Sequence, residues 1–272
     1  MVSTKGMLHV ILPVFVLGFS MLFHFIVSNL KSYKNRKDIS GVHRVLFVIA
    51  HPDDECMFFG PTVVQLHHKG CELHLLCLSS GNYYQRGSAR KRELRASCEI
   101  LGIDPSYVTV IEHTKMPDNP KVKWRDDLVG NIILKQIMQL DIDTVITFDR
   151  NGVSGHSNHV ALYCGVSYLC RESLLPSSCK IYTLHSVSSL RKYIGVIDVP
   201  FSYLFAQAAY TLSHKDKSLP KKAMFAHSSQ MLWFRWFYVY LSRYMIINTY
   251  SQLELPSDED PDSCASEDEK LD

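Results

Sequence analysis

Two short polar segments of the chain each carry a pair of side chains that can bind a metal. His51 and Asp54 lie three residues apart, directly after an apolar run at residues 45–50. His156 and His159, also three residues apart, follow a second apolar run in the segment TFDRNGVSGHSNHV. Side chains at positions i and i+3 share one face at the start of a helix, so each pair can converge on one point.

Two histidines and a carboxylate are sufficient for a catalytic zinc site, which uses three protein ligands and leaves a fourth position for water. Such water titrates near neutral pH and becomes a nucleophile. A hydrolase also needs a carboxylate that takes the proton of the water and a donor that faces the developing oxyanion. The two pairs and Asp53 fill these roles with one histidine to spare. Iron, cobalt or manganese would also fit such ligands.

Each segment alone also has an ordinary structural explanation. Asp53, Asp54 and Glu55 precede a predicted helix, where acidic side chains complement the helix dipole. A single H-x-x-H pair arises readily by chance in a chain with 13 histidines. Both segments follow predicted strands of one sheet, and this coincidence favours a common site over two independent accidents.

The elements that would position these segments alternate between strands and helices. Buried parallel strands are β-branched or fully apolar, and helices often end at glycine. The predicted strands span residues 45–50, 72–78, 107–111, 144–148 and 180–186, and the predicted helices span residues 56–69, 88–101, 125–139 and 157–170. This alternation predicts an α/β fold with a mostly parallel sheet and helices on both faces. Ligands of such sheets bind at the carboxyl ends of the strands, where both polar segments lie.

A long aromatic-rich helix is predicted at residues 219–244. Its segment MLWFRWFYVYLSRYMII contains few polar side chains. The helix either packs on the sheet or lies in a membrane interface. In the second case Trp233, Trp236 and Tyr240 would lie at headgroup depth, with Arg235 and Arg243 near phosphates.

The two ends of the chain differ from its body. Residues 7–30 carry no charge, and their apolar core of 21 residues would span ~31 Å as a helix, about one bilayer core. We therefore predict a transmembrane anchor at residues 1–30, a basic linker at 31–43, a catalytic domain at 44–253 and an acidic, disordered tail at 254–272. A cleaved signal peptide is the alternative, but the first alanine of the chain is Ala50, so a typical small-residue cleavage site is missing.

Charge and composition give the orientation of this anchor. Most basic residues flanking it follow the span, so the positive-inside rule places the large domain in the cytosol. No asparagine begins an N-x-S/T sequon, and the scattered cysteines indicate reduced core thiols. The tail carries nine acids and one lysine, which leaves about +10 on the body. A basic body suits a membrane surface, a phosphate-bearing substrate or a nucleic acid.

The segments AHPDDE at residues 50–55 and SGHSNH at residues 154–159 resemble the zinc-dependent de-N-acetylase family, which includes the LmbE-like proteins and the mycothiol-pathway deacetylase. The resemblance covers residues 44–250. It implies a Rossmann-like fold with the metal at the strand ends. It also implies that His51, Asp54 and His159 bind Zn²⁺, although another divalent metal remains open.

The same resemblance implies roles for further residues. Asp53 would be the general base, and a protonated His156 would stabilise the oxyanion and help the amine leave. Arg90 and His227 would contact the substrate. Glu55 receives no role in the chemistry and would at most anchor the loop or the start of the helix.

One position departs from the bacterial pattern. Bacterial relatives often carry a tyrosine where this chain has Ser154. The stabilisation of the oxyanion would then depend more on His156, or on Tyr83 or Tyr84.

Within the family, the predicted anchor and the segment HSSQMLWFRWF at residues 227–237 most resemble the eukaryotic members that act on N-acetylglucosaminyl-phosphatidylinositol. The resemblance implies release of acetate from this membrane glycolipid, a step of glycosylphosphatidylinositol-anchor biosynthesis, at the endoplasmic-reticulum membrane on its cytosolic side. A deacetylase of a soluble N-acetylglucosamine conjugate and an inactive, membrane-tethered binding protein are the alternatives. No nucleic-acid module is recognisable, and the sequence names no protein partner.

Overall fold

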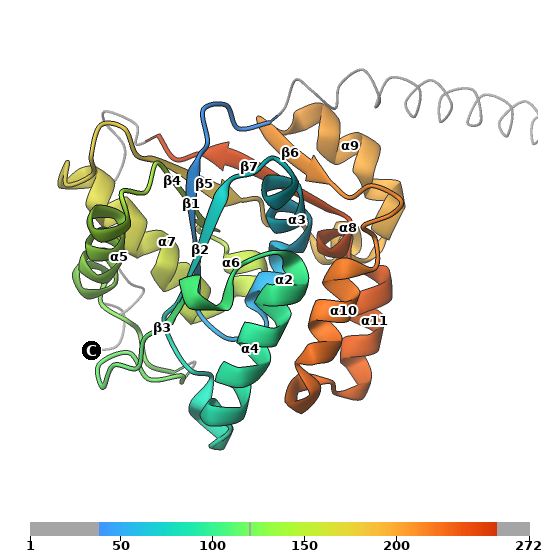
Figure 1. Ribbon diagram of the computed structural model, residues 1–272, viewed down its shortest axis with the longest axis horizontal. Coiled ribbons are helices and arrows are strands. Elements are labelled where there is room, and N and C mark those ends of the chain that lie inside the picture. Colours follow the sequence, from blue (N-terminus) through green and yellow to red (C-terminus); the bar gives the residue numbers. More distant parts are fainter. Residues whose placement is uncertain (1–37, 120, 255–272) are drawn as a thin grey trace, which may run out of the picture.

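The computed structural model describes residues 38–119 and 121–254, which form one seven-stranded sheet with helices on both faces (Figure 1). The strand order is β3-β2-β1-β4-β5-β7-β6. The strands are β1 (Arg44–Ile49), β2 (Glu72–Cys77), β3 (Val108–Val110), β4 (Thr144–Phe148), β5 (Lys180–Leu184), β6 (Ala208–Thr211) and β7 (Ile247–Gln252). The first five pair in parallel, while β7 pairs antiparallel with both β5 and β6.

The two central strands are covered on both faces, which explains their continuous apolar sequences. In β1 every residue after Arg44 is buried, and all five residues of β4 are buried. The two strands are direct neighbours in register, with Val45 opposite Thr144. Their carboxyl ends therefore deliver the polar segments that follow them to the same edge of the sheet.

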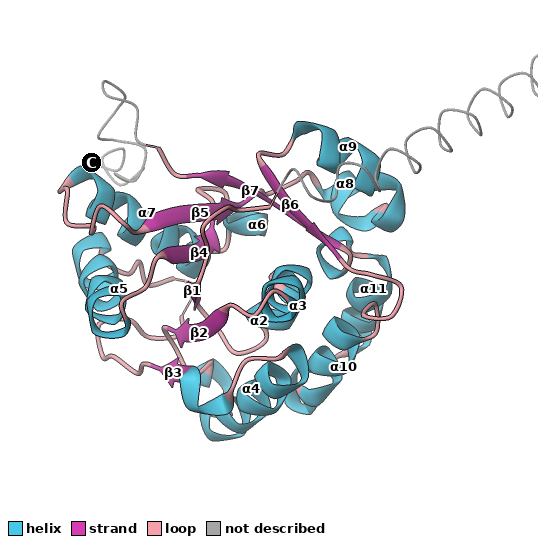
Figure 2. Ribbon diagram, turned by 45° about the horizontal axis from the view of Figure 1, so that its top comes forward, coloured by secondary structure: helices cyan, strands magenta, loops and turns pink. Residues whose placement is uncertain are grey.

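The helices form two layers that flank the sheet (Figure 2). α5 and α7 pack together on one face, and α3, α4 and α10 lie on the other. The helices are α2 (Asp54–Phe58), α3 (Gly60–His68), α4 (Gly87–Leu101), α5 (Asp126–Leu140), α6 (Gly152–Gly155), α7 (Ser157–Arg171), α8 (Ser189–Tyr193), α9 (Asp198–Phe205), α10 (Leu219–Ala226) and α11 (Trp233–Leu241). The change of face occurs between β1 and β4, which makes their junction a topological switch point, the usual ligand crevice of open α/β sheets.

Two predicted helices are broken in the structure. The helix expected at residues 56–69 is split at Phe59 into α2 and α3, and Pro61 lies in the first turn of α3. The helix expected at residues 219–244 is wrong as one element, since α10 ends at Ala226 and α11 begins only at Trp233. His227 interrupts it because its side chain turns into the core.

The two antiparallel strands were not predicted. β6 is only four residues long, and β7 reads INTYSQ, a polar sequence without strict alternation. Buried partners satisfy its polar side chains: Asn248 accepts from the Thr62 hydroxyl at 2.9 Å, and the hydroxyls of Thr62 and Tyr250 lie 2.6 Å apart. The predicted reduced core thiols are confirmed at Cys56, Cys77 and Cys98.

The predicted anchor at residues 1–30 and nearly all of the predicted acidic tail lie outside the described residues. Between residues 38 and 254, position 120 apart, the structure contains no helix with the length and apolar character of a membrane span.

Candidate active site

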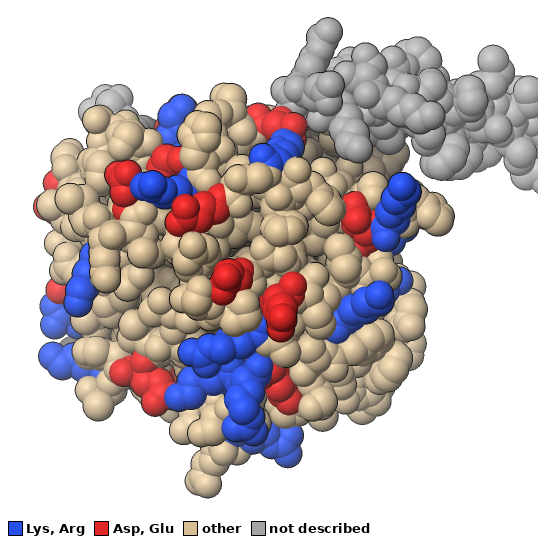
Figure 3. Space-filling model, viewed as in Figure 1, with Lys and Arg blue, Asp and Glu red and all other residues tan. Residues whose placement is uncertain are grey.

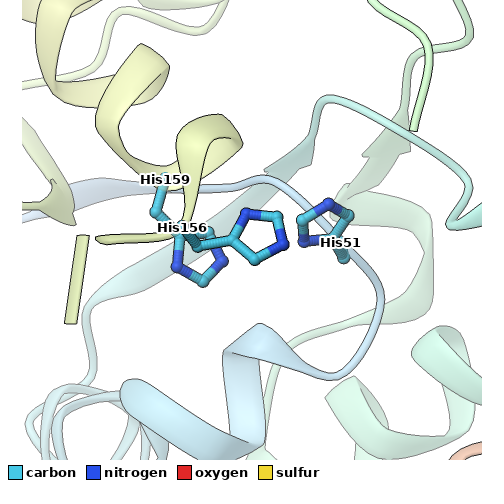
Figure 4. Close-up of side chains that lie close together, drawn as sticks. All are labelled: His51, His156 and His159. Atoms are coloured by element: carbon cyan, nitrogen blue, oxygen red, sulfur yellow. The ribbon is translucent and has the colours of Figure 1, made fainter. Parts of the chain in front are cut away.

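The two polar segments meet at the switch point between β1 and β4. His51 follows β1, His156 caps the N-terminus of α7, and His159 lies in the first turn of α7. Figure 4 shows the three rings grouped together beside the end of β1, and their ring nitrogens lie within 4.8 Å of one another. The structure thus brings together residues that are more than a hundred positions apart, as the sequence predicts.

Asp54 lies between two of these histidines. Its Oδ1 is 3.2 Å from His159 Nε2, and its Oδ2 is 3.7 Å from His51 Nδ1. The backbone N–H groups of Ala50 and His51 donate to Oδ2 and fix the carboxylate. Burial alone would raise the pKa of Asp54, but His159 and His51 outweigh it and lower the pKa well below its ordinary value.

The hydrogen-bond partners of His159 and His51 on the side away from Asp54 are those typical of metal-binding histidines. His159 Nδ1 lies 3.1 Å from the Gly152 carbonyl and donates to it, while its Nε2 faces Asp54. His51 Nε2 lies 3.2 Å from Asp118 Oδ1. Metal-binding histidines usually give their other N–H to a carbonyl or a carboxylate in this way. Burial would lower the pKa of His51, yet Asp118, Asp54 and Asp53 raise it, so the surroundings favour positive charge.

The spacing of these donor atoms fits a small divalent cation. Two ligands at about 2.0–2.1 Å from a tetrahedral ion lie about 3.3 Å apart. The 3.2 Å between His159 Nε2 and Asp54 Oδ1 is close to this value. His159 and Asp54 are therefore spaced for Zn²⁺ or a similar ion, and His51 Nδ1, 3.7 Å from Asp54 Oδ2, is placed beside them as the third ligand.

His156 differs from its two neighbours. Its Nδ1 accepts the backbone N–H of Asn158 at 3.3 Å, so the proton of the neutral ring lies on Nε2. Burial, followed by the charges of His159 and His51, lowers the pKa of His156 to about 4. The surroundings of His156 thus favour its neutral form, whereas the resemblance implies a protonated ring.

Asp53 lies in the same pocket, between two guanidinium groups. Its Oδ1 is 3.5 Å from Arg90 Nη2, and its Oδ2 is 3.2 Å from Arg235 Nη2. The backbone of Asp53 adopts φ 119°, a conformation that a non-glycine residue rarely takes and that functional sites often contain. The guanidinium groups orient a carboxylate that is 97% buried, since only 3% of Asp53 is exposed.

Glu55, which had no predicted chemical role, stabilises the strained backbone of Asp53 through hydrogen bonds. Its Oε2 accepts the backbone N–H of Asp53 at 3.0 Å, while Oε1 accepts from the Ser97 hydroxyl at 2.5 Å and from His227 Nε2 at 2.7 Å. Burial would raise the pKa of Glu55, but His227 and Ser97 lower it. The pair is completely buried.

This contact corrects the prediction for His227. The side chain has no exposed surface and does not reach the pocket wall, so it does not contact a substrate in this structure. Glu55 and His227 also lie near Cys56 as a second group of ligand-type side chains. Their mutual hydrogen bond and their burial give this group a structural function instead.

The pocket above these residues has a volume of about 440 Å³. Arg90 lines it, and its guanidinium also donates to the carbonyl oxygens of Gly81 and Pro52. Ser154 and the exposed rings of Tyr83 and Tyr84 lie on its wall. A space of this size accommodates a sugar ring with its acetamide group.

Three residues of the site were missed by the sequence analysis. Asp118 lies in the loop after β3 and contacts His51. Asn158 Nδ2 is 3.0 Å from His51 Nε2. Arg235 extends from α11 to Asp53. Neither a loop aspartate nor an asparagine inside a helix gives a recognisable signal. Arg235 gives a weak one, because it is the only charged residue of the helix sequence WFRWFYVYL.

The sequence is similar to known proteins over most of its length. Residues 46–169 match the family described as "PIG-L: GlcNAc-PI de-N-acetylase". The chain is 47% identical over 214 residues to the N-acetylglucosaminyl-phosphatidylinositol de-N-acetylase of Bos taurus, a match that covers 78% of this chain and 85% of that protein. It is 35% identical over 241 residues to a probable enzyme of the same name from Dictyostelium discoideum, with 78% and 93% covered.

A solved structure supports the fold. The N,N'-diacetylchitobiose deacetylase from Pyrococcus horikoshii superimposes with a TM-score of 0.59, covering 85% of this chain and 92% of that chain. The sequences are only 15% identical, so this likeness concerns the fold alone. It agrees with the Rossmann-like α/β architecture that the sequence predicts.

Proposed function

The chain belongs to the GlcNAc-PI de-N-acetylase family, and from this premise we propose that it hydrolyses the N-acetyl group of N-acetylglucosaminyl-phosphatidylinositol. The products are glucosaminyl-phosphatidylinositol and acetate. The proposal rests on the 47% identity to the bovine enzyme of this name together with one geometric observation. This observation is the convergence of His51, Asp54 and His159, with Asp53 beside them in one pocket.

We assign the metal to His51, Asp54 and His159, with zinc as the first candidate. A divalent cation bound there supplies a Lewis acid and lowers the pKa of water. Asp53 accepts the proton of the attacking water, because, unlike Asp54 and Asp118, it forms its ion pairs with arginines and not with the histidine ligands. Arg90 and Arg235 keep its oxygens in place.

His156 and the pocket wall complete the site. The Nε2–H of neutral His156 donates to the oxygen on which negative charge develops, and such a preorganised donor contributes about 3–4 kcal/mol to transition-state stabilisation. The departing amine needs a proton, and Asp53 returns the one that it accepted. Tyr83 and Tyr84, which line the pocket, contact the sugar.

The membrane context is part of the proposal. We place the enzyme at the endoplasmic-reticulum membrane, anchored by residues 1–30 with the catalytic domain in the cytosol, in the biosynthesis of glycosylphosphatidylinositol anchors. The uncharged sequence of residues 7–30 and the basic residues after it support this arrangement.

An acetate-release assay on the full chain tests the function. Vesicles that contain N-acetylglucosaminyl-phosphatidylinositol are compared with water-soluble N-acetylglucosaminyl-inositol, and we expect preference for the lipid. Chelation should remove the activity and added zinc restore it. Asp53→Asn should lower kcat by about 10²–10⁴-fold, the usual contribution of a general base, while bound metal stays equimolar.

Three results would contradict the proposal. Full activity of Asp53→Asn would exclude the assigned base. Preference for the soluble conjugate would favour a related deacetylase, and absence of both bound metal and turnover would favour a binding protein.

A further inference from the structure

Helix α11 exposes an unusual number of aromatic side chains. Five of its nine residues are aromatic and between 46% and 76% exposed, and Trp233 at 76% is the most exposed of them. The aromatic residues of this outer face are Trp233, Phe234, Trp236, Phe237 and Tyr240. Contiguous exposed apolar surface on a folded domain marks an interaction site.

The opposite face of the same helix belongs to the catalytic domain. Tyr238 and Val239 are buried, and the Tyr238 hydroxyl donates to the Met57 carbonyl at 2.8 Å. Arg235 extends from this inner face to Asp53. One helix thus forms a wall of the active-site pocket and carries the aromatic face on its outside.

Neighbouring elements extend the aromatic face. α8 packs against α11 and exposes Leu190 and Tyr193, which are 75% and 45% accessible. On the other side, Phe225 of α10 packs against Trp236 with ring centroids 5.1 Å apart. Figures 1 and 2 both show α8, α10 and α11 together on one flank of the molecule.

Basic side chains border this face, and acidic ones do not occur within α8, α10 or α11. Lys221 lies over the Tyr240 ring at 4.5 Å. In Figure 3 the right-hand flank over α10 and α11 is mostly free of charged residues, with a few Lys or Arg side chains on it. Aromatic rings with adjacent lysines match the interface of a bilayer that contains anionic lipids.

The start of the described chain lies toward the same flank. The Ile39 backbone N–H donates to the Tyr210 hydroxyl of β6, and Asp38 lines a small hollow with Tyr203 of α9. The 37 residues before this point therefore join the domain beside α9, which adjoins α8 in both ribbon views. An anchor that starts there can hold the aromatic face against the membrane.

We propose that the face formed by α11 and α8 docks on a phospholipid bilayer, so that the active-site pocket opens along the membrane surface. This inference rests on the proposed function, since it explains how a headgroup of a lipid that stays in the bilayer reaches Asp53. It adds that the catalytic domain itself, and not only an anchor, binds the membrane.

The tryptophans of the chain allow a direct test. There are three: Trp124, which is fully buried in the core, and Trp233 and Trp236 on the proposed docking face. The full chain is reconstituted in vesicles of phosphatidylcholine and phosphatidylinositol whose acyl chains are brominated. We expect strong quenching of the wild-type fluorescence and little quenching of Trp233→Phe/Trp236→Phe, which retains only Trp124.

The quenching result decides the proposal without any catalysis. Wild-type quenching no greater than that of the variant would overturn it. The proposal would also be overturned if Trp233 and Trp236 were shielded from aqueous acrylamide but not quenched by the brominated lipid. In that case a second copy of the chain or another protein would cover the aromatic face.

An activity comparison adds a second readout. Trp233→Ser/Phe237→Ser should lower turnover of vesicle-embedded substrate by at least about tenfold, because each half-exposed aromatic contributes roughly that factor to partitioning. Turnover of the water-soluble analogue should stay unchanged. Met138→Ser, which alters a 64% exposed side chain of α5, is the matched control and should affect neither.

The outcomes separate the two proposals. Equal loss on both substrates would overturn the docking face. Failure of the wild type on both substrates would refute the proposed function, while the quenching experiment would still decide the membrane contact.

Discussion

Replacement of Glu55 by glutamine tests how the strained turn at Asp53 is held. Glu55 is fully buried and accepts hydrogen bonds from His227, Ser97 and the backbone N–H of Asp53. Glutamine keeps the shape of the side chain but removes its charge. It also brings an amide NH₂ group where three donors already point at the carboxylate.

The expected loss of stability follows from the burial of the pair. Removal of one partner of a buried ion pair costs about 3–5 kcal/mol, because the other charge is left without compensation. His227 can release its proton, which favours the lower end of this range. For a domain of this size, about 2–4 °C per kcal/mol gives a decrease in melting temperature of roughly 6–20 °C.

The pH dependence of this loss has a defined sign. Burial would lower the pKa of His227, but Glu55 raises it above the ordinary value of 6.5. The stabilisation by protonated His227 is therefore complete below pH 6.5 and is lost as the pH rises through the raised pKa. The difference in melting temperature between wild type and Glu55→Gln should shrink over that window.

Thermal unfolding and kinetics measured together identify the role of Glu55. If it positions Asp53, kcat should fall about tenfold below the denaturation range while KM changes little. Glu93→Gln is the matched control: this carboxylate bonds Ser228 and Ser229 at the surface, and its loss should cost about 1 kcal/mol or less. A Glu55→Gln protein that melts within 1–2 °C of wild type and keeps its kcat would refute the reasoning.

Two further substitutions test single contacts of the site. Gly81→Ala places a Cβ against the Arg90 guanidinium at φ +67° and should lower kcat about tenfold by displacing this guanidinium. Gly70→Ala, at φ +76° with open space around its Cβ, is the control for backbone strain. Equal effects of the two substitutions on kcat would refute the role of the contact between Gly81 and Arg90. Asp118→Asn should weaken zinc binding by about 10–100-fold, because it removes the carboxylate that orients His51, and competition with a chelator measures this loss. Unchanged zinc affinity would exclude that role.

The parallel half of the fold was predictable because its signal is local. β1 and β4 are apolar or β-branched at nearly every position, and the helices between the strands have ordinary lengths, with α4 ending at Gly102. β7 was not predictable, since its polar side chains become acceptable in the core only through partners such as Thr62, far away in the sequence. The break between α10 and α11 has the same cause: the partner of His227 decides it, not the local helix propensity.

The residues of the site also divide into those that the sequence predicts and those that it does not. His51, Asp54, His156 and His159 were predicted because their spacing after two strands is itself the signal. Asp118 and Arg235 contribute from a loop and from a distant helix, where single residues carry no pattern. His227 shows the remaining difficulty: the sequence placed it near the chemistry but could not tell whether its ring faces the pocket or the core.

The distribution of charge in the site argues for a cation held by the histidines. Glu55 and Asp53 have permanent or buried cationic partners in His227, Arg90 and Arg235. Two other carboxylates, of Asp54 and Asp118, form their ion pairs with His51 and His159 instead. Those pairs last only while the imidazoles are protonated.

An imidazole that binds a metal has lost that proton, so the cation takes over its charge. The same carboxylates that stabilise a proton on His51 in the metal-free protein then stabilise the metal and orient its ligand. Proton and metal therefore compete for one set of atoms. It follows that metal affinity should fall as the pH decreases. The Glu55–His227 pair on the other side of the turn keeps Asp53 in position over that range, because its stabilisation is complete below pH 6.5 and, as the pH decreases further, is lost only when Glu55 is protonated.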